Sequence, residues 1–259
     1  KEFDKPHFYL YYMENKIEIY GIRSIIEAIE SSKEITKVYL LKSNSPQSSL
    51  LRSLIILLER KNIKSSFVPK EKFRKYSDKN HQGAVAILSP VSLLSIEDLI
   101  SSTFDEKLPK TYLLLDGVTD TRNFGAIIRT SVAADVDGII ISQSNSAPIN
   151  ADVVKTSSGG VFKIPIARVS NIKDAILYLN SVNVDIISLS EKADKTIYET
   201  NFKKSVGLIL GSEDKGISKS IIALSNEVVK VPISTKIDSL NVSVAFSAVI
   251  FELVRQRSF

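Results

Sequence analysis

The stretch "TYLLLDGVTDTRNFGAIIRTS", residues 111–131, passes from an apolar run through a polar turn into an apolar helix pattern. Such a run predicts a strand buried on both faces, as in parallel sheets covered by helices. Asn123 and Arg129 are six positions apart, under two helical turns, so their side chains can lie on neighbouring parts of one face. In open α/β sheets, ligands bind beyond the carboxyl ends of the strands. The stretch therefore predicts an α/β fold with a site where this strand ends.

Strands and helices continue to alternate after this stretch. Apolar runs predict further strands at 138–142, 161–169, 184–190, 206–211 and 227–233. The segments between them predict helices near 151–158, 171–181 and 217–225, and a long terminal helix from Ser239. Residues 111–259 are therefore expected to form one α/β domain with a parallel sheet covered on both faces.

A smaller α/β unit precedes this domain. Strands are predicted at 16–21, 37–41, 64–68 and 83–88, with helices at 22–32 and 48–62 and a short basic helix before the last strand. We assign residues 13–88 to this domain and residues 89–110 to a linker with a short helix at 96–101. Met13 is the only methionine and resembles a natural start, so residues 1–12 are expected to be an N-terminal extension.

Composition excludes several kinds of site. Of the 259 residues, 44% are hydrophobic and 24% charged, which is ordinary for a globular protein. The chain has no cysteine, which rules out disulfides and thiolate chemistry, and only two histidines, so we expect no metal centre. No apolar run reaches the length of a membrane span and no signal-like segment opens the sequence. We therefore expect a cytoplasmic protein without a membrane partner.

Positive charge gathers in the first domain. The first 92 residues hold 16 lysines and arginines against 10 acidic residues, whereas the rest of the chain holds 18 against 19. In the densest basic run, residues 60–79, three aromatic residues lie between the cations: Phe67, Phe73 and Tyr76. This pattern suits a nucleic acid whose bases stack, although a basic run is also typical of a plain solvated face. The cations predicted to contact RNA are Lys70, Lys72, Arg74 and Lys75.

A second polar loop ends an apolar strand in "LILGSEDKGIS", residues 208–218. Gly211 and Gly216 lie on either side of Glu213, and two glycines in so short a loop predict a positive φ angle or the close approach of a ligand. The loop lacks the full glycine pattern of a dinucleotide fingerprint and the ending of a phosphate loop. Taken alone, it is equally well explained as an ordinary strand-to-helix turn.

A third polar loop lies in "VPISTKIDSLNVSVAFSAVIFE", residues 231–252, and leads through Ser239 and Asn241 into the terminal helix. Ser239 is a suitable N-cap residue. Asn241 is harder to explain structurally, because asparagine is neither a strong helix former nor apolar. In the same way, Asn123 alone fits a helix cap and Arg129 a surface residue.

Together, the three stretches resemble the signature motifs of the SpoU (TrmH) family of RNA ribose 2′-O-methyltransferases, within the SPOUT superfamily. "NFGAIIRT", "LGSEDKGIS" and "VPISTKIDSLNVSVA" are similar to motifs one, two and three, and the resemblance runs from residue 110 to the C-terminus. The first domain, with "IYGIRSIIEAI" and "HQGAVAI", resembles the family's substrate-binding domain, whose fold is similar to RNA-binding ribosomal proteins. The resemblance implies a C-terminal trefoil knot, a rare exception to the unknotted rule. It also implies a homodimer through the C-terminal helix and the knot region, unless that helix only covers its own sheet.

The resemblance further implies S-adenosylmethionine as the cofactor and a ribose 2′-hydroxyl of RNA as the acceptor, without a metal. Main-chain groups would hold most of the cofactor, at Gly211, Val231 and Leu240. Arg129 is the residue expected at the hydroxyl. It would act either as the base or, because a guanidinium normally keeps its proton, as a group that binds phosphate and orients the hydroxyl.

Four more residues are implied in catalysis by the same resemblance. Asn123, Ser239 and Asn241 would position the nucleotide and Arg129, and Ser239 or water would take the proton in the second reading of Arg129. Glu213 would orient Arg129 or tie its own loop.

Two departures from the family pattern stand out, and they leave alternatives open. This chain has Thr235 where the family usually has glycine, and Asp214 where it often has glycine. The implied substrate is a guanosine of 23S rRNA, with a tRNA or resistance-type rRNA methyltransferase as the alternative. A catalytically inactive RNA-binding member is a further alternative, suggested by Thr235 in a cofactor-adjacent loop. The presence of all five polar residues together argues against it.

Overall fold

The computed structural model describes residues 18–30, 33–42, 48–89, 91–103, 105 and 107–258. The expected N-terminal extension, residues 1–12, lies outside the described residues, as does the start of the strand predicted at 16–21. Contacts divide the chain into two compact units, Lys1–Ser92 with Pro148–Ala151, and Leu93–Ala147 with Asp152–Phe259. Within the described ranges, none of the helices could span a lipid bilayer.

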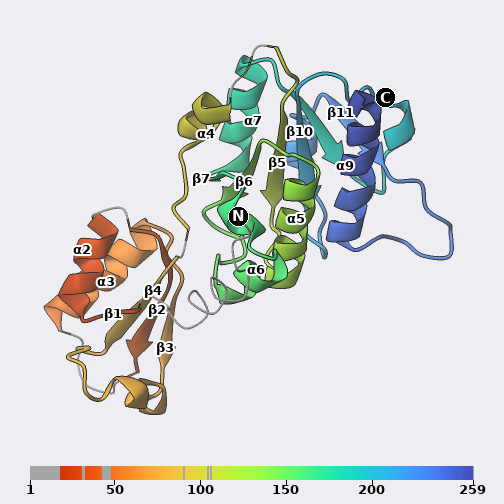
Figure 1. The fold of residues 1–259 in the computed structure, drawn as a ribbon. Coiled ribbons are helices and arrows are strands. Elements are labelled where there is room, and N and C mark those ends of the chain that lie inside the picture. The colour runs from red at the N-terminus through yellow and green to blue at the C-terminus, as the bar shows by residue number, and fades with distance from the viewer. Residues whose placement is uncertain are drawn as a thin grey trace, which may run out of the picture. The chain divides into compact units, whose positions relative to one another are not determined.

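The first unit is a four-stranded sheet with the strand order β1-β4-β2-β3 (Figure 1). Its strands are β1 (Glu18–Tyr20), β2 (Ile35–Leu41), β3 (Ser65–Val68) and β4 (Ala84–Leu88). β4 is antiparallel to β1 and β2, and β3 is parallel to β2. The mixed α/β unit predicted from the sequence is confirmed.

Helices cover the two faces of this first sheet unequally. Two of them, α2 (Ile22–Glu30) and α3 (Ser49–Arg60), pack on the face that carries Val38 and Leu40. Successive residues of a strand point to opposite faces, so Tyr39 and Leu41 face the other way. The 3₁₀ helix η1 (Lys70–Tyr76) packs on that second face through Phe73 and Tyr76.

The second unit is a seven-stranded sheet with the order β7-β6-β5-β10-β8-β11-β9. Every pairing in it is parallel, which confirms the predicted fold class. The strands are β5 (Thr111–Asp116), β6 (Gly138–Ser142), β7 (Ile166–Val169), β8 (Asp185–Leu189), β9 (Lys195–Thr196), β10 (Val206–Gly211) and β11 (Glu227–Lys230). All carboxyl ends therefore lie along one edge of the sheet.

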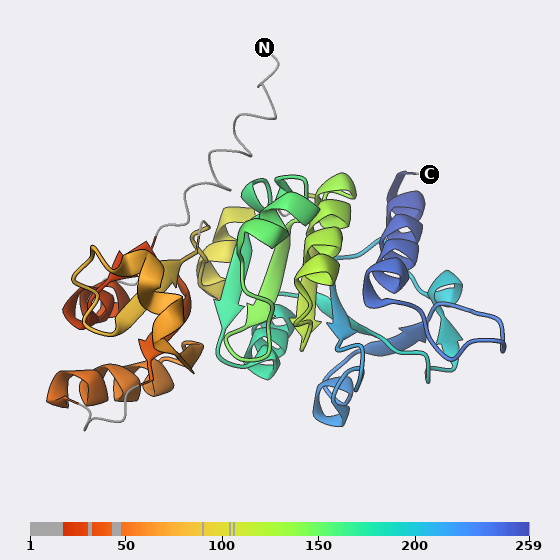
Figure 2. The same ribbon diagram turned by 90° about the horizontal axis from the view of Figure 1, so that it is seen from below.

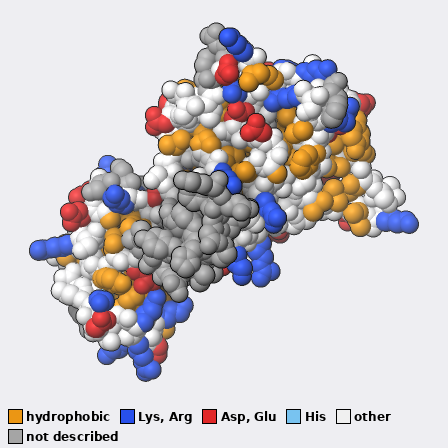
Figure 3. Space-filling view, viewed as in Figure 1, with side chains coloured by type: hydrophobic (Ala, Val, Ile, Leu, Met, Phe, Trp, Pro, Cys, Tyr) orange, Lys and Arg blue, Asp and Glu red, His pale blue; other side chains and the backbone are white. Residues whose placement is uncertain are grey.

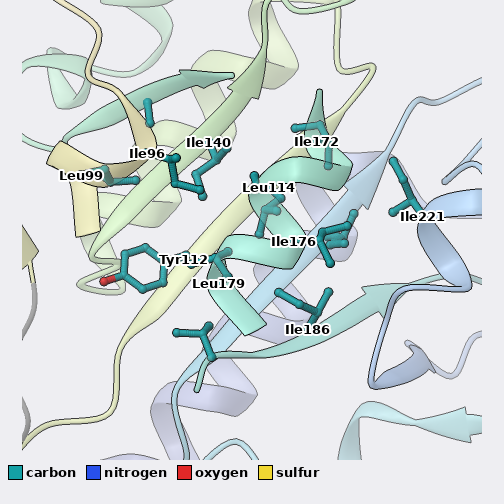
Figure 4. Packing of buried hydrophobic residues seen from close by; sticks show 14 of the residues in the cluster. Ile96, Leu99, Tyr112, Leu114, Ile140, Ile172, Ile176, Leu179, Ile186 and Ile221 are labelled. Carbon is teal, nitrogen blue, oxygen red and sulfur yellow. The ribbon is translucent and has the colours of Figure 1, made fainter. Parts of the chain in front are cut away.

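Helices cover both faces of the second sheet. One face carries α4 (Ile96–Thr103), α7 (Ile172–Ser181) and the short α8 (Lys219–Ile222), whose apolar side chains pack on alternate strand residues such as Tyr112 and Leu114 (Figure 4). The neighbouring strand residues Leu113 and Leu115 are also buried and face the other way. There, α5 (Thr121–Ala133) and α9 (Val242–Ser258) lie side by side (Figure 2). Shorter segments connect these elements: α6 (Ala151–Thr156), η2 (Gly160–Phe162) and η3 (Ile197–Glu199).

The predicted linker contains a helix that belongs to the second unit. α4 buries Ile96, Leu99 and Ile100, which follow the spacing of one helix face, and Leu94 forms a bridge with Ala167 of β7. The contacts divide the chain after Ser92, whereas the sequence placed the domain boundaries at 88 and 110. The apolar stripe of α4 explains this difference, because a helix with a core-facing stripe packs on a sheet.

Candidate active site at the carboxyl edge of the parallel sheet

The loops that follow β5 and β10 pack against each other. The two strands are neighbours, and Gly211 lies in register with Asp116 at their carboxyl ends. Asp116 Oδ2 accepts a hydrogen bond from the Ser218 main-chain N–H (3.4 Å). Gly117 has a φ of +86°, and a Cβ there would lie 3.2 Å from Ser212 Cβ, so glycine suits this close turn. The first and second motifs are thus held together at one edge of the sheet.

Asp120, and not Asn123, caps α5. Asp120 Oδ1 accepts hydrogen bonds from the main-chain N–H groups of Arg122 and Asn123, both at 2.8 Å. The interpretation of Asn123 as a helix cap is therefore wrong. Asp120 directly precedes the helix, and an aspartate at that position is the sequence signal for this cap. The Asn123 side chain therefore lies in the first turn of α5 and is free to bind elsewhere.

Asn241, and not Ser239, caps α9, which begins at Val242. Asn241 Oδ1 accepts from Ser243 N–H (3.0 Å) and from the Ser243 hydroxyl (2.7 Å), as an N-cap side chain does. The helix predicted from Ser239 thus starts three residues later. Ser239 is exposed, and within the described chain its side chain makes no hydrogen bond.

Asn123, Glu213 and Asn241 form a closed set of hydrogen bonds, called here the amide–carboxylate triangle. Glu213 Oε1 accepts from the Asn123 side-chain amide and from Asn241 Nδ2, the latter at 3.1 Å. Asn241 Nδ2 also donates to Asn123 Oδ1 (3.1 Å). The three residues come from three different motifs, separated by up to 118 positions. The triangle therefore ties all three loops together at the carboxyl edge.

Arg129 lies outside this triangle. Six residues along a helix amount to about 9 Å of rise and a turn of roughly 240°, which carries Arg129 away from Asn123. Its backbone instead passes η2, since a Cβ on Gly160 would lie 3.7 Å from Arg129 Cα. The side chain is exposed and, over the described part of the chain, makes no hydrogen bond or ion pair. No hydrogen bond or ion pair joins Arg129 and Glu213 in the structure.

The two glycines of the second motif serve the loop itself. Gly216 has a φ of +64° and pairs with Ser212 through two main-chain hydrogen bonds, at 2.9 and 3.2 Å. A Cβ on Gly211 would lie 2.1 Å from the carbonyl carbon of Gly216, so no other residue fits there. The tight approach to Gly211 is thus made by the loop's own backbone.

Val231 and Leu240 offer main-chain groups at the same edge. Val231 directly follows β11, and Leu240 precedes Asn241 of the triangle. Both residues are half-buried, and neither main chain makes a hydrogen bond to the residues that the structure describes. Main-chain N–H and C=O groups without partners suit a ligand with many hydrogen-bonding atoms.

The two departures from the family pattern cause no backbone strain. Thr235 and Asp214 are both exposed, and neither is among the residues with a positive φ angle. Their side chains are therefore compatible with the backbone at these positions, where glycine would not be required.

Part of the basic run forms η1, and two of the three predicted stacking residues are buried there, whereas Phe67 on β3 is 50% exposed. Phe73 and Tyr76 are only 3% and 4% exposed, so they are wrong as platforms for bases. They are three apart, which places them on one side of a 3₁₀ helix. All four predicted cations are exposed: Lys70, Lys72, Arg74 and Lys75. Within the described residues, only Lys75 of the four has a carboxylate partner, since its Nζ lies 2.9 Å from Glu18 Oε1.

Comparison with known proteins identifies both regions. The SpoU rRNA Methylase family matches residues 110–251, and the family described as RNA 2′-O ribose methyltransferase substrate binding matches residues 19–94. The chain is 34% identical over 238 residues to an uncharacterized tRNA/rRNA methyltransferase of Mycoplasma pneumoniae, covering 90% of this chain and 95% of the relative. It is 31% identical over 244 residues to the 23S rRNA (guanosine-2′-O-)-methyltransferase RlmB of Escherichia coli, covering 93% and 98%.

A solved structure shares the fold. The SpoU methyltransferase AviRb of Streptomyces viridochromogenes, solved in complex with its cofactor AdoMet, superposes with a TM-score of 0.59 at 21% identity. The match covers 93% of this chain and 90% of AviRb. The three motifs, the parallel sheet and both family matches agree: the chain belongs to the SpoU rRNA methylase family of RNA 2′-O-ribose methyltransferases.

Proposed function

We propose that the protein transfers the methyl group of S-adenosylmethionine to a ribose 2′-hydroxyl of RNA at the carboxyl edge of its second sheet. The observation that carries the proposal is the amide–carboxylate triangle, because Asn123, Glu213 and Asn241 come from three separate motifs and hydrogen-bond to one another. Three loops held in one arrangement can present a cofactor and an acceptor in fixed positions. Positioning of this kind is the main contribution a protein makes to such a transfer.

The residues at this edge fit the cofactor. Val231 and Leu240 are half-buried residues whose main-chain groups have no hydrogen-bond partner in the described chain, and we assign these groups to the cofactor together with the main chain of Gly211. When bound, S-adenosylmethionine supplies a methyl group already activated on a sulfonium, so that a neutral thioether leaves as the O–C bond forms. Binding through main-chain groups explains why the chain needs no acidic signature for the cofactor's ribose.

Arg129 is assigned to the RNA. Its guanidinium is exposed and without a partner in the described chain, so it can bind a phosphate next to the target nucleotide and orient the 2′-hydroxyl. This role keeps the guanidinium protonated, as is usual for arginine in proteins. The hydroxyl proton then leaves to Ser239 or to water, and Ser239 is exposed in the loop two residues before the triangle.

Glu213 is assigned to the support of the loops. One of its oxygens accepts two amide hydrogen bonds from the triangle, which fixes the second motif relative to the first and the third. Its contribution to catalysis is therefore to hold Asn123 and Asn241, and not to orient Arg129.

The proposed substrate is a guanosine of 23S rRNA. The similarity to the Escherichia coli enzyme named for this reaction covers 93% of this chain, and so includes the substrate-binding region. The alternative is a tRNA, which the name of the Mycoplasma pneumoniae relative leaves open. With rRNA as the substrate, the protein would act in the cytoplasm.

We further propose that two copies of the protein form a homodimer through α9 and the knot region. The C-terminal part of each chain would form a trefoil knot. Val244 and Phe251 are 52% and 50% exposed, and their spacing of seven residues puts them on one face of α9. An exposed apolar face on a terminal helix suits a second copy of the chain. Sedimentation of wild-type protein and of Phe251→Lys tests the dimer: a monomeric wild type would exclude it.

The experiment that tests the function uses labelled cofactor. The protein is incubated with tritiated S-adenosylmethionine and, separately, with protein-free 23S rRNA and with total tRNA from a strain that lacks the enzyme. The proposal expects label in 23S rRNA at one guanosine, found by nuclease mapping, and label only in tRNA would favour the alternative. Calorimetry with the cofactor distinguishes an active enzyme from a catalytically inactive RNA-binding protein. The inactive protein is expected not to bind S-adenosylmethionine even at millimolar concentration.

A further inference from the structure

The second face of the first sheet carries a hollow next to η1. The hollow has a volume of about 230 Å³, and the residues that line it are Tyr39, Val68, Lys72, Phe73, Lys75 and Tyr76. Figure 3 shows Lys and Arg side chains gathered on this unit, at the lower left of the view. The hollow is smaller than the ~300–1000 Å³ of pockets for drug-sized ligands, so it suits one small flat group.

The strand register explains why Tyr39 is accessible there. Tyr39 lies opposite Val85 on one side and Ser66 on the other, and these partners share its face of the sheet. η1 packs Phe73 and Tyr76 over Val85 and Val68, whereas Tyr39 stays half-buried at the edge of that contact. Of the three aromatic rings that line the hollow, Phe73 and Tyr76 of the basic run are buried, and only Tyr39 on the strand is half-buried.

Two lysines lie close to this ring. Lys37 Nζ is 5.1 Å and Lys72 Nζ 6.0 Å from the centroid of Tyr39, within the range of a cation–π contact. Neither has a carboxylate partner in the part of the chain that the structure describes. Lys75, by contrast, pairs with Glu18 and lies 4.5 Å from the centroid of Tyr76. Lys37 and Lys72 therefore leave uncompensated positive charge beside an aromatic face.

We propose that this hollow binds one unpaired nucleotide of the RNA, with its base stacked on Tyr39 and its phosphate held by Lys37 and Lys72. An aromatic ring beside unpaired cations is the combination that binds single-stranded RNA. Both lysines have flexible four-carbon side chains, so their ammonium groups can move to the phosphate while the base takes the ring face. The proposal rests on RNA being the substrate, and it adds a contact outside the loops of the second unit.

The test compares binding of two short RNAs by fluorescence anisotropy. One is a single-stranded hexanucleotide, and the other is the same ribose-phosphate chain without bases. We expect Tyr39→Leu to weaken binding of the hexanucleotide about 5- to 150-fold, the range for one base stacked on an aromatic ring. Binding of the abasic chain should not change. Tyr39→Phe keeps the ring and should bind within about twofold of wild type.

Matched variants control for folding and for charge. Phe67→Leu removes an aromatic residue that is 50% exposed on the adjacent strand but faces the other side of the sheet, and should bind as wild type. Lys37→Ala and Lys72→Ala should each weaken the binding of both RNAs and lower the salt dependence of that binding. Arg23→Ala on α2 should change neither quantity. If Tyr39→Leu fails to fold, Tyr39→Phe and the two lysine variants still test the site.

The outcomes separate this proposal from the proposed function. If wild type and Tyr39→Leu bind the hexanucleotide with equal affinity, the hollow is not a base site. The same conclusion follows if Tyr39→Leu loses equal affinity for both RNAs, or if wild type binds neither RNA. Methyl transfer by the wild-type protein would still stand in those cases. A Tyr39-dependent preference for the RNA with bases, without any methyl transfer, would support the hollow and contradict the function.

Discussion

The amide–carboxylate triangle and the basic hollow hold their polar groups in opposite ways. In the triangle, Asn123, Glu213 and Asn241 hydrogen-bond to one another, which restricts the position of each side chain. In the hollow, Lys37 and Lys72 lie beside an aromatic ring without carboxylate partners in the described chain. A closed set of hydrogen bonds fixes geometry, whereas unpaired cations supply charge that depends little on position.

This difference predicts different responses to mutation. A site that depends on geometry should respond to the exchange of single atoms, because a misplacement of 1 Å can cost about 100-fold in rate. A surface that depends on charge should respond to the number of cations removed, in proportion. Arg129 is the exception in the second unit, since it is a cation without an ion-pair partner in the described chain and we place it in catalysis.

The largest effect is expected from Arg129→Ala. Loss of the group that orients the hydroxyl should lower the rate of methyl transfer at least ~100-fold. The affinity for S-adenosylmethionine should stay within about threefold, because main-chain groups of other loops are assigned to the cofactor. Single-turnover transfer and calorimetry measure the two quantities. Arg122→Ala removes an exposed arginine of the same helix and is the control, and a fully active Arg129→Ala would remove Arg129 from the mechanism.

A smaller loss is expected from Asn241→Asp, which exchanges one group in the triangle. The aspartate can still accept from Ser243 N–H and cap α9, but it places a carboxylate against Glu213. We expect a rate loss of about 10- to 100-fold, which corresponds to a lost hydrogen bond to a charged group. Two carboxyl groups in one site retain a proton more readily than one alone, so the loss should shrink as the pH falls.

The control for Asn241→Asp is Asn171→Asp, which makes the same exchange at the N-cap of α7. Within the described chain, the Asn171 side chain forms a hydrogen bond only with Lys173 N–H of its own helix, so this variant should remain fully active. Equal activity of Asn241→Asp and wild type would mean that the triangle has no part in catalysis.

Removal of three cations from η1 tests the charge-based half of the comparison. Neutralising Lys70, Lys72 and Arg74 together should make the plot of log binding constant against log salt less steep by about 2, since each phosphate contact on a single strand contributes ~0.7. Lys75 is spared because Glu18 already pairs with it. The control removes three exposed arginines from the opposite face of the unit, Arg23, Arg52 and Arg60, and should leave the slope unchanged. If the two triple variants had equal slopes, η1 would be an ordinary solvated face without a specific role in RNA binding.

The smallest functional effect is expected at Glu252 in α9. Hydrogen bonds from Arg255 and Gln256 lower the pKa of Glu252 from 4.5 to about 2. A carboxyl group whose pKa is lower in the folded than in the unfolded state stabilises the fold at pH values above the unfolded-state pKa. This contribution to the free energy of unfolding is lost as the pH falls toward the folded-state pKa. Wild type should therefore be more stable than Glu252→Gln above pH 4.5, and the difference should shrink between pH 4.5 and about 2. Urea unfolding across this range measures it, and a constant difference would contradict the assignment.

The three motifs could be recognised from the sequence because their order and spacing along the chain together resemble those of the family, although each alone also fits an ordinary loop. The contacts within the triangle could not be predicted, because they depend on loop conformations that bring Glu213 and Asn241 to the same amide. Arg129 was expected near Asn123 on one face, but six residues of helix carry it away.

The errors in the first unit have a similar cause. Phe73 and Tyr76 look like exposed aromatics in a basic run, yet their spacing of three residues becomes a buried side in a 3₁₀ helix. The sequence does not distinguish Tyr39, because in the strand pattern it alternates with the buried Val38 and Leu40. Only the packing of η1 over part of the sheet face distinguishes it.

We propose that the edge where Asn123, Glu213 and Asn241 meet methylates a ribose oxygen. Complete alkaline hydrolysis of RNA labelled by the protein tests this directly, because a 2′-O-methyl group blocks cleavage of the adjacent phosphodiester. We predict that the label remains in an alkali-stable dinucleotide and that Asn241→Asp yields much less of it. Label released as a mononucleotide, which places the methyl group on a base, would contradict the account.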